Sequence, residues 1–169
     1  MSLWTLSHRA SAGTRQIADR HYNRQKIGAD QFVPPGRCLV LRRPGAFWVT
    51  SYPFARFTKH AWAGAMICSA FRRESGPLAS ELIVSALAAT AWKAITDPAW
   101  HEFPKSHDGY SLITFVDPEK TKRKRDPGRC FRRAGFVEIG ESKGGLVALG
   151  FKVPFPSFEA PNGATLELL

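Results

Sequence analysis

The clearest signal in the chain is the sequence Arg72-Arg73-Glu74-Ser75-Gly76-Pro77 followed by the apolar segment Leu78–Ile95. Leucine, isoleucine and alanine recur in this segment at the three- and four-residue spacing of an α-helix. Pro77 is placed in the first turn of that helix, where its missing N–H group does no harm. Asp97-Pro98 marks the end of the helix. We therefore predict a long helix that is entered through a short basic turn.

Strand-like segments flank this helix on both sides. The run His60–Phe71 before it is rich in apolar residues and is expected to be one long strand. The run Ser111–Val116 after it contains β-branched residues and is also expected to be a strand. A strand, a helix and a second strand in this order form a parallel crossover. The middle of the chain therefore predicts a sheet with a parallel pair of strands.

The remaining segments predict further strands and two more helices. Arg37–Leu41 and Phe47–Ser51 are separated by Arg-Arg-Pro-Gly and are expected to form a hairpin. The other expected strands are Leu3–Leu6, Phe136–Ile139 and Leu146–Val153, and the other expected helices are Ser11–Tyr22 and Pro127–Arg133. The order of these elements predicts an α/β fold on a mixed sheet. We expect residues 1–153 to form a single domain and residues 154–169 to form a Pro-rich C-terminal tail.

The chain of 169 residues has the length of one domain, and its charge is strongly positive. Lysine and arginine number 24 against 14 aspartate and glutamate residues, which gives a formal net charge of +10. A hydrophobic content of 44% argues against a disordered chain. The charge predicts a polyanionic partner, which is a nucleic acid, a phosphate-bearing cofactor or an anionic membrane surface.

Several other classes of protein do not fit the sequence. The longest apolar runs, Ala61–Ala70 and Leu82–Trp92, are about half of the ~18–20 residues that a membrane span needs. The N-terminus lacks the apolar run and the small-residue cleavage site of a signal peptide. The cysteines Cys38, Cys68 and Cys130 form no Cys-x-x-Cys pair, so neither a disulfide framework nor a zinc site is indicated. We expect a cytoplasmic protein with no membrane partner.

Most of the excess charge is concentrated in the segment Glu119–Arg133. It holds eight basic and two acidic residues, a surplus of +6 within the net +10 of the chain. The basic residues are Lys120, Lys122, Arg123, Lys124, Arg125, Arg129, Arg132 and Arg133. Such a cluster suits contact with a phosphate backbone, so we expect it to bind nucleic acid. A solvated face or a flexible basic loop is the alternative interpretation.

The basic turn Arg72–Gly76 is a second candidate site for an anion. It joins a strand to a helix N-terminus, where backbone N–H groups and the helix dipole favour negative charge. Arg72 and Arg73 would add charge-assisted hydrogen bonds to a phosphate group. The alternative interpretation is an ordinary helix cap with solvated arginines.

Polar side chains that can carry chemistry follow the first predicted helix and the strand Ser111–Val116. His21 and Tyr22 lie between two arginines and are candidates for acid–base catalysis or for metal binding. Asp117, at the carboxyl end of the strand, is a third candidate. The alternatives are a structural histidine and an aspartate that caps a turn.

Other polar and aromatic residues are expected to be structural. Asp126 precedes a proline and is expected to be the N-cap of the basic helix. Trp48, Phe57 and Trp62 are able to stack on a base, but aromatic residues on strands more often belong to a core. No cysteine has a histidine and a carboxylate near it in the sequence, so a cysteine nucleophile is not expected.

Two motifs resemble those of the GNAT acyltransferases. Arg73-x-x-Gly76-x-Leu78 resembles their acyl-CoA pyrophosphate loop, Gln/Arg-x-x-Gly-x-Gly/Ala, with leucine in place of the last small residue. The segment Cys130–Phe136 resembles one in which a tyrosine, four residues before Gly-Phe, protonates the leaving CoA thiolate, but Phe131 stands at that position here. The resemblance implies a mostly antiparallel sheet with a splayed parallel pair of strands. It also implies acetyl-CoA or a related CoA species as cofactor, bound by Arg72, Arg73, Gly76, Leu78 and Ala79.

Three short stretches, in this order, are similar to phage Mom-type DNA modification proteins, a GNAT-like group. They are Arg20-His21-Tyr22, Phe115-Val116-Asp117-Pro118 and Arg125–Phe131. The resemblance implies that the exocyclic amine of adenine in DNA receives a carbamoylmethyl-type group, which protects the DNA against restriction. It further implies that His21, Tyr22 and Asp117 form the polar set at the acceptor, and such a set is also able to bind iron.

Two other functions remain open from the sequence. An ordinary acetyl-CoA-dependent N-acetyltransferase would act on an amine, a peptide or a small molecule, and it would leave the +6 segment unexplained. A non-catalytic DNA-binding protein on the same scaffold is compatible with Phe131. Acetyl-CoA binding and salt-sensitive DNA binding distinguish the three functions.

Overall fold

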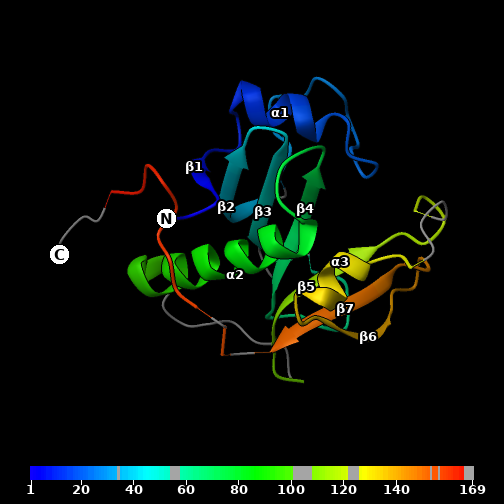
Figure 1. The fold of residues 1–169 in the computed structure, drawn as a ribbon. Coiled ribbons are helices and arrows are strands. Elements are labelled where there is room, and N and C mark those ends of the chain that lie inside the picture. The colour runs from blue at the N-terminus through cyan, green and yellow to red at the C-terminus, as the bar shows by residue number, and fades with distance from the viewer. Residues whose placement is uncertain are drawn as a thin grey trace.

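The structure, a computed structural model, describes residues 1–33, 35–53, 58–100, 108–121, 126–152, 154–155 and 157–165. In this part of the chain seven strands form one sheet in the order β1-β2-β3-β4-β5-β7-β6 (Figure 1). The strands are β1 (Thr5–Ser7), β2 (Gly36–Arg43), β3 (Ala46–Pro53), β4 (Met66–Arg73), β5 (Tyr110–Val116), β6 (Val137–Glu141) and β7 (Val147–Lys152). The helices are α1 (Ala12–Ala18), α2 (Ala79–Thr96), the 3₁₀ turn η2 (Pro98–Trp100) and α3 (Arg129–Arg133).

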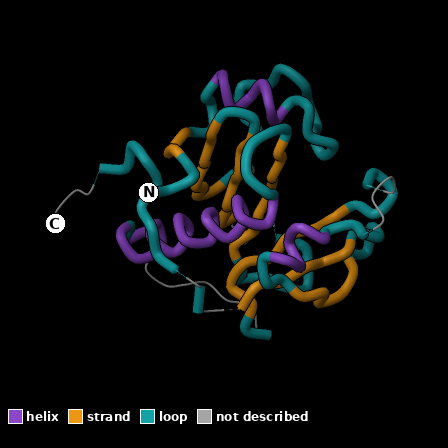
Figure 2. The backbone as a smooth tube through the Cα atoms, in the orientation of Figure 1, coloured by secondary structure: helices purple, strands orange, loops and turns teal. Residues whose placement is uncertain are grey.

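The sheet is mixed, with a single parallel pair among the described strands. Neighbouring strands are antiparallel except β4 and β5, which are parallel. Helix α2 follows β4 in the chain and is the crossover that the strand–helix–strand order predicts. Figure 2 shows that the helices (purple) lie beside the strands (orange) and flank the sheet. The predicted fold class, α/β with a mixed, mostly antiparallel sheet and flanking helices, is confirmed.

The two faces of the sheet carry separate cores. In β2, the side chains of Leu39 and Leu41 pack in the core beneath α2, whereas Val40 packs with Ala18 of α1 on the other face. Successive side chains of a strand point to opposite faces, which divides the apolar residues in this way. The α2 residues at helical spacing are fully buried, namely Leu82, Ile83, Ala86 and Leu87. Their burial explains why the helical pattern in this segment is so clear in the sequence.

The prediction of one long strand over His60–Phe71 is wrong. Strand β4 begins only at Met66, and the residues before it form a turn in which the Ala65 N–H donates to the Trp62 carbonyl at 3.3 Å. Trp62 and Ala65 are both buried in a small core on the sheet. The apolar character of this segment therefore reflects packing of a turn and not continuous strand pairing.

The aromatic residues proposed for base stacking also have clear positions. Trp48 on β3 is fully buried, and Trp62 is 7% exposed. For these two residues the structure supports the core interpretation, since a buried ring has no free face for a base. Phe57 lies outside the described residues.

The predicted helix starts and ends need correction at α1 and α2. Helix α1 ends at Ala18 instead of Tyr22, because the His21 N–H turns back to the Ala18 carbonyl at 2.9 Å with three-residue spacing. Pro77 lies just before α2, whose N-cap is Leu78, and not in the first turn. The shorter α1 releases His21 and Tyr22 from the helix and allows them to reach the sheet.

Helix α3 begins at Arg129, two residues later than predicted. Gly128 before it has a φ of +80°, and a Cβ atom at this position would lie 2.7 Å from Leu149, so glycine is required there. The prediction that Asp126 is the N-cap of this helix is therefore wrong, because Gly128 occupies that position. Asp126 instead accepts a bond from the Arg129 N–H through its backbone carbonyl at 3.1 Å.

The described part of the predicted tail packs on the domain. The Glu159 N–H donates to the Ala88 carbonyl of α2 at 3.2 Å, and the Asn162 N–H donates to the Trp4 carbonyl at 2.9 Å. Asn162 also forms a parallel bridge with Thr5 of β1. Among the described residues, no helix is both long and apolar enough to cross a lipid bilayer.

Candidate functional site

The parallel strands β4 and β5 separate after a short paired stretch. They pair only at Met66–Cys68 with Leu112–Thr114, although both strands continue beyond this point. Next to it the register between β3 and β4 shifts, because Thr50 faces Cys68 and Val49 faces Ala70. Ser69 is thus the extra residue of a β-bulge. A bulge bends its strand and increases the local twist, which accounts for the position of the split.

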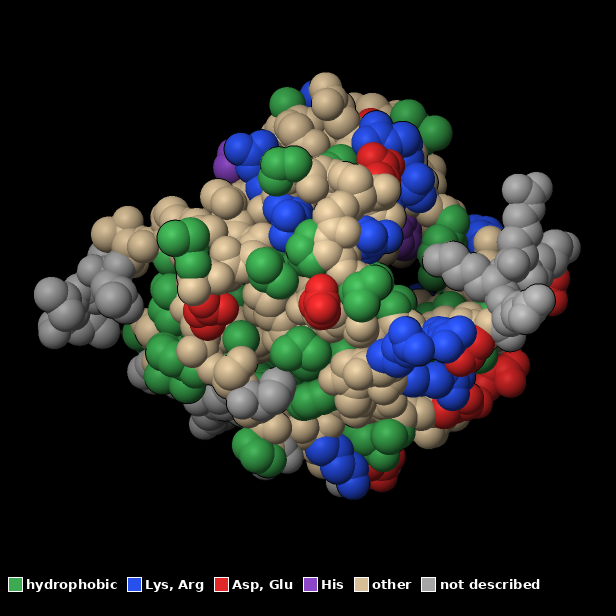
Figure 3. All heavy atoms as spheres, in the orientation of Figure 1, with side chains coloured by type: hydrophobic (Ala, Val, Ile, Leu, Met, Phe, Trp, Pro, Cys, Tyr) green, Lys and Arg blue, Asp and Glu red, His purple; other side chains and the backbone are tan. Residues whose placement is uncertain are grey.

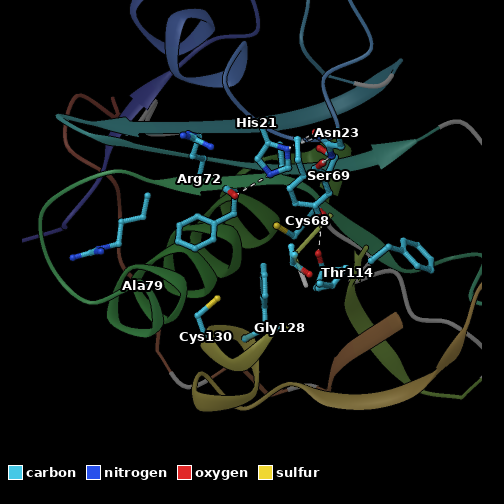
Figure 4. A pocket seen from close by; sticks show the side chains of 17 residues that line it. His21, Asn23, Cys68, Ser69, Arg72, Ala79, Thr114, Gly128 and Cys130 are labelled. Carbon is cyan, nitrogen blue, oxygen red and sulfur yellow. Dashed lines mark hydrogen bonds between the residues drawn. The ribbon is translucent and has the colours of Figure 1, made fainter. Parts of the chain in front are cut away.

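A cavity of about 260 Å³ lies in the split between β4 and β5 (Figure 4). The two strands form its walls, α3 contributes Cys130 and Phe131, and the segment after α1 contributes His21–Asn23. Ala79, the first residue of α2, lines the cavity together with Arg72 and Arg73. The cavity lining therefore includes three of the five residues predicted to bind the cofactor and two of the three predicted catalytic residues.

His21 and Asn23 form hydrogen bonds with the free edge of β4. His21 Nε2 lies 3.0 Å from the Phe71 carbonyl, and Asn23 Nδ2 donates to the Ser69 carbonyl at 3.1 Å. Both carbonyls lie beyond the last residue of β4 that pairs with β5. The two side chains thus satisfy backbone groups that a continuing β5 would otherwise have to satisfy.

The hydrogen bonds of His21 define how its ring is used. A carbonyl oxygen only accepts, so Nε2 carries a proton and donates it to Phe71. Nδ1 lies against Asn23, whose side-chain oxygen and backbone N–H both contact it. In this arrangement both ring nitrogens are engaged within the protein. His21 is therefore well placed to orient the site, and acid–base work would require its ring to leave these bonds.

Tyr22 stands between His21 and Asp117. Its ring stacks on the His21 ring with centroids 4.6 Å apart. Burial of the phenol raises the pKa of Tyr22, and a hydrogen bond from the Asp117 backbone opposes this shift. The hydroxyl therefore stays protonated at neutral pH and is held at the start of the turn that follows β5.

The carboxylate of Asp117 caps that turn. Its Oδ1 accepts hydrogen bonds from the Glu119 N–H at 2.9 Å and the Lys120 N–H at 3.2 Å. This is the turn-capping alternative that the sequence leaves open. Asp117 is not among the lining residues of the cavity, unlike His21 and Tyr22. It is connected to the site through its backbone hydrogen bond with Tyr22.

Phe131 occupies the position at which the resemblance calls for a tyrosine. Its side chain is 8% exposed and packs edge-to-face on Phe71 and Phe136, with centroids 6.0 and 5.3 Å away. It lines the cavity with an apolar ring that has no proton to give. Burial also raises the pKa of the Cys68 thiol, so this neighbour is not a reactive thiolate.

The loop between β4 and α2 is held together by its own charges. Glu74 accepts two bonds from Arg20, at 2.6 and 2.7 Å, and one from Arg72 at 2.9 Å. The bonds with Arg20 and then Arg72 lower the pKa of Glu74 to about 2. Arg73 folds back onto the loop and donates to the carbonyls of Pro77 and Gly76, at 2.5 and 2.7 Å. One net positive charge remains in the trio of Arg20, Arg72 and Glu74.

The start of α2 is suited to a phosphate group. The N–H groups of Ala79, Ser80 and Glu81 lie in its first turn and have no acceptor within the helix, whereas the Leu78 N–H donates to the Glu81 carboxylate at 3.1 Å. The side chain of Leu78 is 58% exposed, so the leucine that replaces a small residue of the GNAT pattern does not fill the loop. Phosphate oxygens are able to accept from these N–H groups, and the apolar walls of the cavity suit an alkyl arm. Among the lining residues, Ala79 and Arg72 are the donors that this cavity offers to a phosphate group of CoA.

The residues of the site do not fit iron in this arrangement. Among the described residues, no three His, Cys, Asp or Glu side chains lie together as a metal-binding group. Both nitrogens of His21 and the capping oxygen of Asp117 already have hydrogen-bond partners. We derive no chemistry through a metal from this set.

The basic segment is described at both ends but not in its middle. Lys122–Arg125 lie outside the described residues. Lys120 Nζ donates to the Tyr22 carbonyl at 3.4 Å, and Arg132 pairs with Glu138 at 3.0 Å and with Asp126 at 3.7 Å. The two remaining arginines are exposed and have no acidic partner in the described part of the chain, namely Arg129 and Arg133. Figure 3 shows Lys and Arg side chains on both sides of a hollow.

Three residues of the site were not predicted from the sequence. Asn23 donates to the distant Ser69 carbonyl, Ser69 is the bulge residue of β4, and Glu74 pairs with Arg20. Asn23 could have been found from the sequence, because it lies two residues after His21 in the same polar stretch. The bulge at Ser69 had none, because it depends on the register of β3.

Comparison of the chain with protein-family models, with curated proteins and with solved structures found no match. The geometry of the cavity, its loop and its charged rim is therefore the basis for assigning a function.

Proposed function

We propose that this protein is a CoA-dependent transferase that modifies the exocyclic amine of adenine in DNA. The observation that carries the proposal is the cavity in the β4–β5 split, which extends from a basic loop and a helix N-terminus to the stacked pair His21–Tyr22. The resemblance to GNAT acyltransferases and to phage Mom-type proteins supports the same chemistry. CoA, when bound, supplies an activated group for transfer.

Each part of the site has a task in this proposal. The first-turn N–H groups of α2 and the loop closed by Arg73 bind the phosphates of the cofactor. His21 and Asn23 satisfy the free edge of β4 and so keep the split open. Tyr22 presents a protonated hydroxyl, held by the turn that Asp117 caps, to the acceptor.

The acceptor is the most demanding part of the reaction. The lone pair of the adenine amine is delocalised into the ring, so the amine is a poor nucleophile and needs close positioning. The base must also leave the stack, which costs a few kcal/mol in duplex DNA. The exposed Arg129 and Arg133 and the basic residues 122–125 would attract the phosphate backbone toward this site. Such an enzyme would work in the cytoplasm, as the sequence leads us to expect.

Nucleoside mass spectrometry of DNA from cells that express the protein tests this function. We expect a modified adenosine in cells with the wild-type protein and its loss in the variants Tyr22→Phe, His21→Ala and Asp117→Ala. The variant Tyr52→Phe, on β3 and outside the described lining of the cavity, is the control. Unmodified adenosine in cells that contain abundant folded protein would contradict the proposal.

An ordinary N-acetyltransferase is the second candidate, and one observation favours it. Lys120 and Arg132 are engaged within the protein, so the described part of the basic segment has less free charge than the sequence indicates. Such an enzyme would bind acetyl-CoA and acetylate an amine without affinity for DNA. Titration with a DNA duplex at low and high salt separates the two candidates, since only the DNA-modifying enzyme gives salt-sensitive binding.

A further inference from the structure

A second cavity, of about 400 Å³, adjoins the first at the bulge of β4. It lies between α1, the segment that follows α1 and the sheet, and it reaches Phe47 on β3. Ser69 and Ala70 line both cavities, as do His21 and Asn23. A group bound in the second cavity would therefore meet the cofactor cavity next to the bulge.

Two aromatic rings and two amide side chains give this second cavity its chemistry. Phe32 is half-buried and stands edge-to-face on the fully buried Phe47, with centroids 6.0 Å apart. Gln25 and Gln31 are exposed at the rim. The Gln31 amide has no hydrogen-bond partner in the described part of the chain, whereas Gln25 Nε2 donates to the Asn23 carbonyl at 3.2 Å.

The charge of the second cavity is compensated. The guanidinium of Arg24 lines it, but Arg24 Nε pairs with Asp19 at 2.8 Å and the side chain is only 9% exposed. Its other nitrogens donate to the carbonyls of Gln31 and Ala29, at 3.0 and 2.7 Å. Each guanidinium nitrogen of Arg24 thus has a partner within the protein, and Asp19 balances its charge. The lining therefore suits a neutral, planar and polar-edged ligand better than an anion.

We propose that this second cavity receives the target base of a nucleic acid, a 6-aminopurine turned out of its strand. The inference rests on the proposed function and names the place where its acceptor binds. A carboxamide offers one donor and one acceptor side by side, which matches the amine and ring nitrogen of adenine. The ring of Phe32 supplies a surface for stacking. From there the exocyclic amine faces the cofactor cavity at Ser69 and Ala70.

The test uses the full chain and two single-stranded oligonucleotides that differ only at a central position, adenine in one and an abasic residue in the other. We expect the wild-type protein to bind the adenine strand about tenfold more tightly, the scale of one stacked base. Gln31→Ala and Phe32→Leu should reduce this preference severalfold. Gln16→Ala, an exposed glutamine of α1 away from both cavities, should leave it unchanged.

The outcomes separate this inference from the function on which it rests. Equal preference for adenine in the wild type and in Gln31→Ala and Phe32→Leu, with DNA still modified by all three, would overturn the inference alone. A wild-type protein that binds neither strand and leaves DNA unmodified would overturn the proposed function as well. Acetyl-CoA binding, followed by thermal shift, should be the same in all variants. Gln31 is exposed, so its variant remains informative even if Phe32→Leu fails to fold.

Discussion

The basic turn Arg72–Gly76 and the basic segment Glu119–Arg133 are both rich in arginine, but they use it differently. In the turn, Arg72 shares Glu74 with Arg20, and Arg73 donates to the carbonyls of its own loop. In the segment, Arg129 and Arg133 extend into solvent without an acidic partner among the described residues. The charges of the turn hold a fixed loop, whereas two of the four described basic residues of the segment, Arg129 and Arg133, have no acidic partner in the described part of the chain.

A count of charges alone therefore does not identify the partner of either region. A fixed loop presents backbone N–H groups at defined positions, which suits a small anion such as a pyrophosphate. Exposed arginines on a short helix act at a distance and without fixed geometry, which suits a long polyanion. The two regions should therefore respond independently when their charges are changed.

The largest effect should follow from neutralising residues 122–125 in the basic segment. Replacing Lys122, Arg123, Lys124 and Arg125 by glutamine removes four positive charges. We expect DNA affinity at low salt to fall about a hundredfold and the salt slope to decrease by up to about 4, one for each lost phosphate contact. Acetyl-CoA binding should be unchanged. A parallel loss of both affinities would show that the two regions act as one site.

The converse change is Gly76→Ala in the turn. Gly76 has a φ of +93°, and a Cβ atom there would lie 3.3 Å from the Arg43 guanidinium. The strain of such a residue is about 1–3 kcal/mol, so we expect acetyl-CoA affinity to fall about tenfold and DNA affinity to stay constant. Ser75→Ala in the same loop keeps the backbone and is the control. Isothermal titration with acetyl-CoA and with duplex DNA measures both values.

The fold was largely predictable because its signals are local. Helix α2 and the strand β5 follow from apolar periodicity within single segments, and their order fixes the parallel crossover. The segment His60–Phe71 misled the prediction because a run of apolar residues marks burial and not strand pairing. Trp62 and Ala65 are buried within a turn, which composition does not distinguish from a strand.

The sequence named some of the residues that line the cavity, but it did not indicate how they are arranged. Of the residues named from the sequence, the cavity lining includes His21, Tyr22, Arg72, Arg73 and Ala79, but it does not include Gly76, Leu78 or Asp117. The engagement of His21 with Phe71 joins residues 50 positions apart, and no local pattern encodes it. The bulge at Ser69 depends in the same way on β3, so the split that opens the cavity has no signal within β4 itself.

A smaller effect should distinguish free from paired arginines within α3. Arg129→Gln removes a charge that has no acidic partner in the described structure, whereas Arg132→Gln removes one that is paired with Glu138 and Asp126. We expect Arg129→Gln to lower DNA affinity about threefold to tenfold and the salt slope by about 1. Arg132→Gln should have less effect on both. Equal effects would mean that the ion pairs of Arg132 do not persist in the complex with DNA.

The smallest effect concerns the pH dependence of the turn. Bonds from Arg20 and Arg72 lower the pKa of Glu74 from 4.5 to about 2, so the folded protein holds this carboxylate ionised more strongly than the unfolded chain does. Its contribution to the free energy of unfolding is complete above about pH 4.5 and is lost as the pH falls toward 2. The Glu74 side chain lies at the surface and is 28% exposed, and solvent screening makes this contribution small. Urea unfolding of the wild type and of Glu74→Gln should therefore show a difference in the free energy of unfolding at pH 7 that is smaller at pH 3.

The control is the same comparison in the Arg20→Gln background, which removes the stronger partner of Glu74. There we expect a smaller difference at pH 7 and a smaller change between pH 7 and pH 3. If the difference in the free energy of unfolding stays constant from pH 7 to pH 3, the ion pairs of Glu74 do not stabilise the turn. The turn would then not be a fixed loop, and the contrast with the basic segment would no longer hold.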